Sequence, residues 1–310
     1  MRFNLFSWIM DKKNKTFTFL NPEHLAPIRN LDLRARLIVE GTIAGLHQSP
    51  YHGFSTEFLE YRPYLPGEST RRIDWRKFAK TDRTVVRLFE DETNLYANIL
   101  IDKSASMKFS STTAMTKYDY ARTLAASLAL ILVRQRDAVG LSAFDETTSC
   151  YIAPHSTNIQ LKTIMTKLES MEASGVTRCG AALSRCARAL KKRGLCIVIS
   201  DLFDEPEEII RGLRHLRFKK QDIIVLRIAD PMEQNFKYEA SLKLHDLETG
   251  ENLSLDPVTA AHFFNQGAAS HYAVIKRACQ ELTIDCELIL ITEPFHKALL
   301  RVLEKRRRML

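Results

Sequence analysis

The chain has 310 residues, of which 45% are hydrophobic and 26% are charged, and its formal net charge at pH 7 is +8. These values are ordinary for a globular protein with an apolar core, and they exclude a wholly disordered chain, a collagen and a small disulfide scaffold. The longest nearly uncharged apolar stretch, LAASLALILV at 124–133, is about half a bilayer span. We therefore expect no transmembrane segment and a cytoplasmic protein.

Residues 1–92 are predicted to form a small, strand-rich module. Apolar residues at spacings of three and four predict a helix over 31–48. Alternating patterns predict strands at 57–64 and 84–90, and the Pro66-Gly67 step predicts a tight turn. The character of the sequence changes near residue 93, where we expect a second domain, 93–310, to begin.

In this second domain, short apolar strands alternate with helices. The alternation predicts an α/β fold with a doubly wound, mainly parallel sheet of the Rossmann type, covered by helices on both faces. Strands are predicted at 95–101, 138–144, 148–153, 195–200, 222–228 and 284–291, helices at 117–135, 158–171, 178–192, 207–216, 258–281 and 295–307, and a hairpin at 241–255. In such sheets ligands bind beyond the carboxyl ends of the strands, where the strand order reverses.

Acidic and hydroxyl side chains follow the predicted strands. Asp102 ends one strand and begins an Asp-x-Ser-x-Ser sequence with Ser104 and Ser106, and Asp201 directly follows the strand at 195–200. Thr177 adds a hydroxyl in a Gly-Val-Thr sequence just before a helix. These hard oxygen donors suit Mg²⁺ or Mn²⁺ and not zinc or copper. The alternative is that the serines only cap a helix.

The segments ILIDKSASM, Gly175-Val176-Thr177 and IVISDL resemble the three loops of a von Willebrand factor A domain that form its metal-ion-dependent adhesion site (MIDAS). The resemblance covers about residues 93–293. It implies that Ser104, Ser106 and Thr177 offer hydroxyls to the cation, and that Asp102 and Asp201 act directly or through water. It also implies that the vacant metal position takes a carboxylate from a partner protein.

Three further stretches, EFLEYRPYLPGESTRRIDW (57–75), VVRLFEDE (85–92) and HDLETGENLSLD (245–256), resemble the family called domain of unknown function fifty-eight. Its members carry a von Willebrand A-like domain and are typically encoded beside MoxR-type AAA+ ATPases. The resemblance implies an adaptor that works with such an ATPase in chaperone-like maturation or assembly of other proteins. Glu68 and Lys80 depart from the Asp and Arg that the family usually has.

The charged and aromatic residues of the first of these stretches allow two interpretations. They form either a surface that recognises a partner or an internal network that fixes the module onto the α/β domain. The residues concerned are Glu57, Glu60, Arg62, Tyr64, Arg71, Arg72, Asp74 and Trp75.

Two other functions remain open. The chain is alternatively a metal-free structural adaptor, or a Mg²⁺-dependent phosphohydrolase with Asp102 as nucleophile. Such phosphatases usually have a second acid two residues later, where this chain has Ser104. The sequence contains no phosphate-binding lysine loop and no convincing pairing of a nucleophile with a histidine, so we expect no enzyme.

Basic residues cluster at KKRG (191–194), RFKK (217–220) and EKRRR (304–308), all at predicted helix ends. Cations there complement the helix dipole, which favours solvated helix termini over a nucleic-acid patch. No recognisable nucleic-acid motif accompanies the charge, so we expect no specific nucleic-acid partner.

Overall fold

The computed structural model describes residues 20–47, 60–63, 75–88, 95–111, 114–145, 148–176, 178–236, 242–245, 252–255 and 257–309. The strands are β1 (Glu60–Pro63), β2 (Val85–Leu88), β3 (Tyr96–Asp102), β4 (Ala138–Phe144), β5 (Thr148–His155), β6 (Leu195–Ser200), β7 (Asp222–Ala229), β8 (Leu242–His245), β9 (Asn252–Leu255) and β10 (Asp285–Leu290). The α-helices are α2 (Pro22–Leu25), α3 (Leu31–His47), α4 (Trp75–Thr81), α5 (Lys117–Arg134), α6 (Asn158–Ser170), α7 (Cys179–Ala189), α8 (Pro206–Phe218), α9 (Pro231–Gln234), α10 (Pro257–Glu281) and α11 (Phe295–Met309). A 3₁₀ turn covers Ala105–Lys108.

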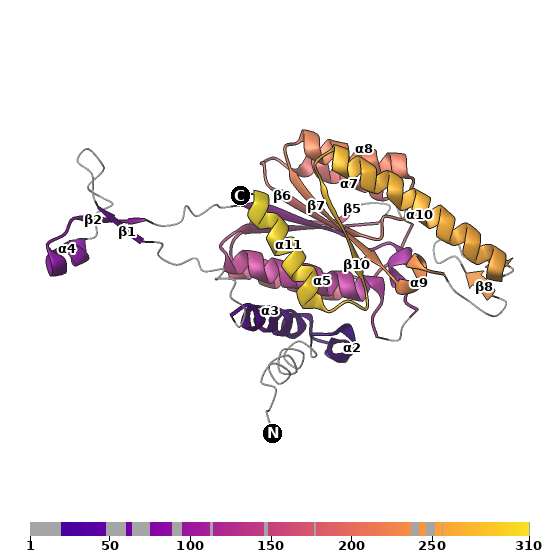
Figure 1. Ribbon diagram of the computed structural model, residues 1–310, viewed down its shortest axis with the longest axis horizontal. Coiled ribbons are helices and arrows are strands. Elements are labelled where there is room, and N and C mark those ends of the chain that lie inside the picture. Colours follow the sequence, from indigo (N-terminus) through magenta and orange to yellow (C-terminus); the bar gives the residue numbers. More distant parts are fainter. Residues whose placement is uncertain are drawn as a thin grey trace, which may run out of the picture.

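A six-stranded sheet with the order β10-β7-β6-β3-β4-β5 forms the centre of the protein (Figure 1). All neighbouring strands are parallel except β4 and β5, which are antiparallel. With β3 counted as the first strand, this is the doubly wound order of a Rossmann-type sheet, and the order reverses between β3 and β6. The predicted α/β fold class is confirmed.

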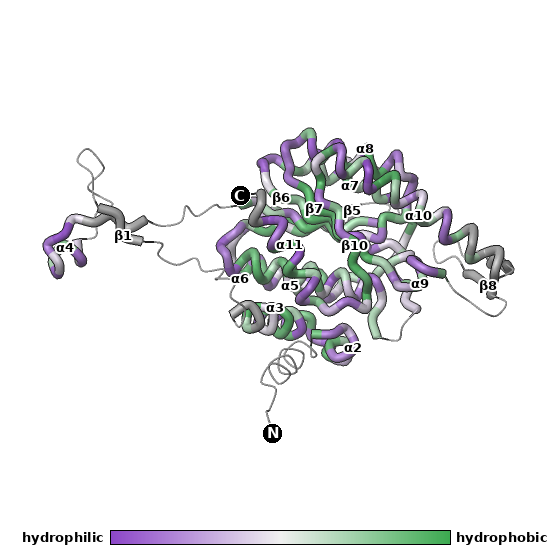
Figure 2. Tube along the Cα trace, in the orientation of Figure 1, coloured by the Kyte–Doolittle hydropathy of each residue, from purple (hydrophilic) through white to green (hydrophobic). Residues whose placement is uncertain are grey.

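Helices cover both faces of the sheet, and each face has its own apolar core. One core joins α3, α5, α6 and α11 to the sheet, and the other joins α7, α8 and α10 to it. The burial comes from continuous apolar strands such as LCIVIS in β6, all of whose residues are buried. Figure 2 shows the central strands in green and the outer helices with mixed hydropathy.

Helix α5, predicted at 117–135, is covered on most of its sides. It begins at a Thr116 cap, whose hydroxyl oxygen accepts from the Asp119 N–H at 3.0 Å. Its middle, Leu124 to Val133, is buried throughout. The sheet covers one side of the helix, and α3 packs against another.

The helix predicted over 31–48 is α3, which ends one residue earlier. Its buried face includes Ala35 and Ile38, both fully inaccessible, in the same apolar core as α5. The division at residue 92/93 stays a prediction, and the structure adds that the α3 segment packs with the α/β core.

The N-terminal segment between α3 and β3 contains the antiparallel pair β1–β2 and the helix α4. Both strands fall within the predicted ranges, whereas α4 was not predicted. Trp75 begins α4, is 57% exposed and meets Phe78 edge-on with ring centroids 6.0 Å apart. Glu57, Tyr64, Arg71, Arg72 and Asp74 lie outside the described residues.

The predicted hairpin at 241–255 is the antiparallel pair β8–β9. Within the described ranges, no helix is both long enough and apolar enough to span a bilayer.

Candidate metal centre

The parallel pairing of β3 and β6 brings the two predicted acids to one end of the sheet. Ile101 pairs with Ile199 in the register of these strands, so Asp102 and Asp201 follow on either side of the point where the strand order reverses. Both carboxylates are buried, with 0% and 1% exposure. Two of the predicted ligands therefore meet at the place where this class of sheet binds ligands.

Asp102 is held by hydrogen bonds at both carboxylate oxygens. Its Oδ1 accepts from the Ser104 backbone N–H at 2.9 Å, and its Oδ2 accepts from the Ser200 hydroxyl at 2.6 Å. The Ser200 oxygen in turn accepts from the Leu202 N–H at 2.9 Å. These bonds fix the orientation of the carboxylate before any ligand binds.

The two serine hydroxyls and Asp201 form a cluster of three oxygens. Ser104 Oγ lies 3.0 Å from Ser106 Oγ, and the Ser106 hydroxyl donates to Asp201 Oδ2 at 2.9 Å. Neighbouring ligands of an octahedral Mg²⁺, each about 2.1 Å from the ion, lie about 3.0 Å apart. The spacing of the two serine oxygens therefore fits adjacent positions of a Mg²⁺ coordination shell, and Asp201 lies beside them.

Thr177, the fifth predicted ligand, lies outside the described residues. The residues just before it are joined to the Asp102 loop by backbone hydrogen bonds. The Ala105 N–H donates to Gly175 O at 2.9 Å, and the Ser174 N–H donates to Lys103 O at 2.6 Å. Gly175 has φ +85°, a left-handed conformation that favours glycine and turns the chain at this point.

A buried lysine that the sequence analysis missed completes the site. The Lys117 ammonium group donates to Asp201 Oδ2 at 2.7 Å and to Glu233 Oε1 at 2.5 Å, and the side chain is fully inaccessible. Burial lowers the pKa of Lys117, but the charges of Asp201 and Glu233 more than reverse this and raise it above its ordinary value. The lysine is therefore a permanent cation beside Asp201.

The ionisable groups next to the serine oxygens carry more negative than positive charge. With all groups ionised, three carboxylates (Asp102, Asp201 and Glu233) face one ammonium (Lys117), which leaves a formal charge of −2. Burial, and after it the charge of Asp201, raises the pKa of Asp102 well above its usual range. A divalent cation would neutralise this excess, so the donors present fit Mg²⁺ or Mn²⁺.

The donors are mainly hydroxyls and not clustered carboxylates. In the part of the chain that the structure describes, no group of three or more His, Cys, Asp or Glu side chains is placed to hold a metal. The four described candidates would therefore hold a cation through Ser104 and Ser106 directly, with the two carboxylates close by. Because Asp201 Oδ2 already accepts from Ser106 and Lys117, contact through water suits it best.

The rim of the site combines an ion pair with apolar side chains. Lys103 Nζ lies 2.6 Å from Asp145 Oδ2, which joins the loops that follow β3 and β4. Phe203 and Val176 flank the cluster on the loops that follow β6 and precede Thr177, and they are 45% and 41% exposed. The site thus lies at an accessible edge with apolar contacts available beside it.

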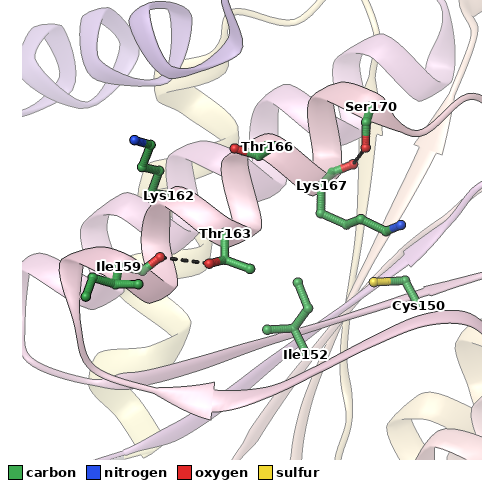
Figure 3. Close-up of a pocket in the computed structure, with 8 residues that line it drawn as sticks. All are labelled: Cys150, Ile152, Ile159, Lys162, Thr163, Thr166, Lys167 and Ser170. Carbon is green, nitrogen blue, oxygen red and sulfur yellow. Dashed lines mark hydrogen bonds between the residues drawn. The ribbon is translucent and has the colours of Figure 1, made fainter.

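One pocket lies away from this site, between β5 and α6 (Figure 3). It has a volume of about 510 Å³ and is lined by Cys150, Ile152, Ile159, Lys162, Thr163, Thr166, Lys167 and Ser170. A smaller one of about 390 Å³ includes Lys103 and Ser174 and lies beside the Asp102 loop. Neither contains the predicted metal ligands.

Lys117, Glu233 and Ser200 are the functional-site residues that sequence reasoning missed. Lys117 is the first residue of α5, where a cation opposes the helix dipole. That unfavourable position is a signal that a buried anion lies nearby. Ser200 was missed because it ends an apolar strand pattern. Glu233 was missed because it lies in a four-residue helix, which begins with a capping box formed with Asp230.

The sheet order and the loops after β3 and β6 give the chain a von Willebrand factor A-like α/β fold. The family described as "Protein of unknown function DUF58" matches residues 60–273, and the chain belongs to this family. It is 25% identical over 262 residues to an uncharacterized protein of Mycobacterium tuberculosis, a match that covers 83% of this chain and 81% of that protein.

Solved structures with a similar fold include BatB of Bacteroides thetaiotaomicron and the SpRpn10 VWA domain. The match to BatB has 16% identity and a TM-score of 0.47, and it covers 69% of this chain and 99% of BatB. The match to the SpRpn10 VWA domain has 11% identity and a TM-score of 0.42, and it covers 67% of this chain and 94% of that domain.

Proposed function

We propose that the chain is a metal-dependent protein-interaction module. Asp102, Ser104, Ser106, Thr177 and Asp201 hold a Mg²⁺ or Mn²⁺ ion, and an acidic side chain of a partner protein completes the coordination. The observation that carries the proposal is the pair of Ser104 and Ser106 oxygens at octahedral spacing, with the buried carboxylates of Asp102 and Asp201 close by. When bound, the cation supplies a strong local positive charge that attracts a carboxylate.

The exposed rim supports a protein as the ligand. Phe203 and Val176 offer apolar surface beside the charge, a combination that suits a partner side chain anchored by its carboxylate and covered by its neighbours. From the family resemblance, we propose a MoxR-type AAA+ ATPase as the partner, acting with this chain in the cytoplasm in maturation or assembly of other proteins.

The hydrogen bonds that Asp102 accepts favour an interaction module over an enzyme. A phosphatase nucleophile needs a carboxylate oxygen free to attack, whereas both Asp102 oxygens accept hydrogen bonds from Ser104 and Ser200. The alternative of a metal-free adaptor has its own support, because the Lys117 ammonium already provides Asp201 with a cation.

The test is the affinity of the full-length chain for the MoxR-type ATPase of the same organism, measured by biolayer interferometry. Chelation is a poor control because the ATPase itself requires Mg²⁺, so a Ser104→Ala/Ser106→Ala variant removes the site instead. We expect this variant to lose about tenfold or more in affinity. Ser170→Ala, an exposed serine on α6, is the matched control. Equal affinity of the double variant and the wild type would contradict the proposal.

A further inference from the structure

The opposite end of the sheet, where the parallel strands begin, carries a concentration of exposed cations. Five exposed basic residues lie on the two loops that enter β6 and β7, and the partly buried Arg217 lies in the last turn of α8: Lys191, Lys192, Arg193, Arg217, Lys219 and Lys220. The loops are adjacent, because the Gln221 side-chain amide donates to Lys192 O at 2.7 Å and the Asp222 N–H donates to Gly194 O at 2.9 Å. Asp222, the first residue of β7, pairs with Arg217 at 3.0 Å and with Arg193 at 3.7 Å. We call these six residues the basic face.

Two exposed apolar side chains lie at this end of the sheet. Phe218, the last residue of α8, is 82% exposed, and Lys219 and Lys220 follow it directly. Ile159, in the first turn of α6, is 80% exposed. It lies at the same end of the sheet, because Gln160 Nε2 donates to Val139 O at the start of β4, at 2.8 Å. Among the described residues these are the two most exposed large apolar side chains.

The helix dipole explains the position of the cations but not that of the exposed apolar side chains. Helices α7 and α8 both end at the basic face, and cations near helix carboxyl ends are favourable. That effect does not explain why a phenylalanine and an isoleucine are highly exposed to solvent at the same end. Exposed apolar side chains at the same surface as charged ones are typical of an interaction site.

We propose that the basic face, with Phe218 and Ile159, docks on an anionic lipid surface. Lysine clusters are attracted to anionic headgroups, and an apolar side chain that inserts among the acyl chains adds the second contact that stable peripheral binding requires. Phe218 and Ile159 belong to helices on opposite faces of the sheet, so a broad, flat partner reaches both. A bilayer has that shape.

A nucleic acid fits this surface less well. Single-stranded nucleic acids bind through aromatic platforms on which successive bases stack. Phe218 provides one exposed ring, but Ile159, the other exposed apolar side chain, cannot stack on a base. Tyr96, the nearest aromatic ring to the lysines of the first loop, is already covered by the Lys192 ammonium at 4.2 Å from its centroid.

Docking in this orientation has a consequence for the metal centre. Asp102 and Asp201 lie at the carboxyl ends of β3 and β6, and the basic face lies at the amino ends of β6 and β7. The candidate metal centre therefore faces away from the bilayer, which leaves it open to a protein partner. The docking itself does not depend on the metal.

The test is co-sedimentation of the full-length chain with vesicles of phosphatidylcholine alone or mixed with phosphatidylserine. We expect binding to the mixed vesicles only, weakening as salt increases. Each surface cation contributes about fivefold to partitioning, so Lys219→Gln/Lys220→Gln should lower it about thirtyfold. The matched control, Lys108→Gln/Lys297→Gln, removes the same charge from exposed positions at the other end of the sheet and should bind like the wild type.

The apolar contacts are tested separately. Phe218→Ser and Ile159→Ser should each weaken vesicle binding several-fold while the dependence on salt is retained. The proposal is wrong if the wild type does not sediment with anionic vesicles, or if the variants and the control bind equally. It is also wrong if a single-stranded oligonucleotide binds through Lys219 and Lys220 while vesicles do not.

Discussion

The two ends of the central sheet carry charge in opposite ways. At the carboxyl ends of β3 and β6, the charged groups Asp102, Asp201 and Lys117 are buried, and hydrogen bonds fix their positions. At the amino ends, the lysines of the basic face are exposed. Buried charge is costly unless it is paired, whereas exposed charge contributes little to stability. The comparison therefore predicts that equal changes of charge have unequal effects at the two ends.

The largest effect is expected for Lys117→Met. The substitution leaves Asp201 and Glu233 buried without their cation, and losing one partner of a buried ion pair costs about 3–5 kcal/mol of unfolding free energy. Urea unfolding followed by circular dichroism measures the loss. The matched change at the exposed end, Lys219→Met, should cost less than about 0.5 kcal/mol. An equal loss of unfolding free energy in both variants would contradict the proposed difference between the two ends of the sheet.

Mg²⁺ should stabilise the Lys117→Met variant more than the wild type. Removing the ammonium leaves the local formal charge at −3 and not −2, so a cation gains more by binding. Thermal unfolding with and without Mg²⁺ gives the comparison. A larger shift in the wild type would show that Lys117 does not compete with a cation for Asp201.

A second buried ion pair sharpens the comparison, because it lies at the amino end. Arg306 of α11 pairs with Asp137, just before β4, and their side chains are 10% and 1% exposed. We expect Arg306→Met to cost about 3 kcal/mol in urea unfolding. Arg277→Met, at a side chain that is 83% exposed, is the control. A negligible effect at Arg306 would mean that position in the sheet, and not burial, decides the cost.

Removing the Ser200 hydroxyl should have an intermediate effect. Ser200→Ala leaves Asp102 Oδ2 and the Leu202 N–H without their buried partner, which costs about 1–3 kcal/mol. Chemical denaturation of Ser170→Ala, whose hydroxyl is exposed, provides the reference. If both variants unfold at the same denaturant concentration, the hydrogen bonds of Asp102 are not stabilising.

The smallest effect is expected for Thr116→Ala, which removes the cap of α5. Loss of such a cap costs about 1 kcal/mol. Thr163→Ala, at a solvent-exposed position in the middle of α6, should lower the free energy of unfolding by less. Thermal melts of the two variants measure the difference, and an equal shift would contradict a capping role for Thr116.

The fold was predictable because each buried strand is recognisable from its own short stretch of sequence. Runs such as LCIVIS and AVGLSAF are continuously apolar, and β4 and β6 have the predicted limits. Asp102 and Asp201 were found because each comes where an apolar run ends. The short helices α2, α4 and α9 were missed, since four, seven and four residues are too few to show a period.

The environment of the site was predictable only in part. Sequence order places Asp102 and Asp201 at strand ends. It does not show that Lys117 reaches Asp201 from 84 residues before it, or that Glu233, on a later helix, pairs with the same lysine. Similarly, the periodicity of 31–48 predicts a helix without indicating that Ile38 packs in the same core as α5. Long-range contacts of this kind depend on the assembled sheet.

The most direct test of the central claim is calorimetric titration of Mg²⁺ into the wild type and into Ser104→Ala/Ser106→Ala, with circular dichroism to verify that the variant is folded. The account predicts saturable binding at one site in the wild type and its loss in the variant, because the two hydroxyls are the direct ligands. No binding by the wild type at millimolar Mg²⁺, or equal binding by both proteins, would contradict it.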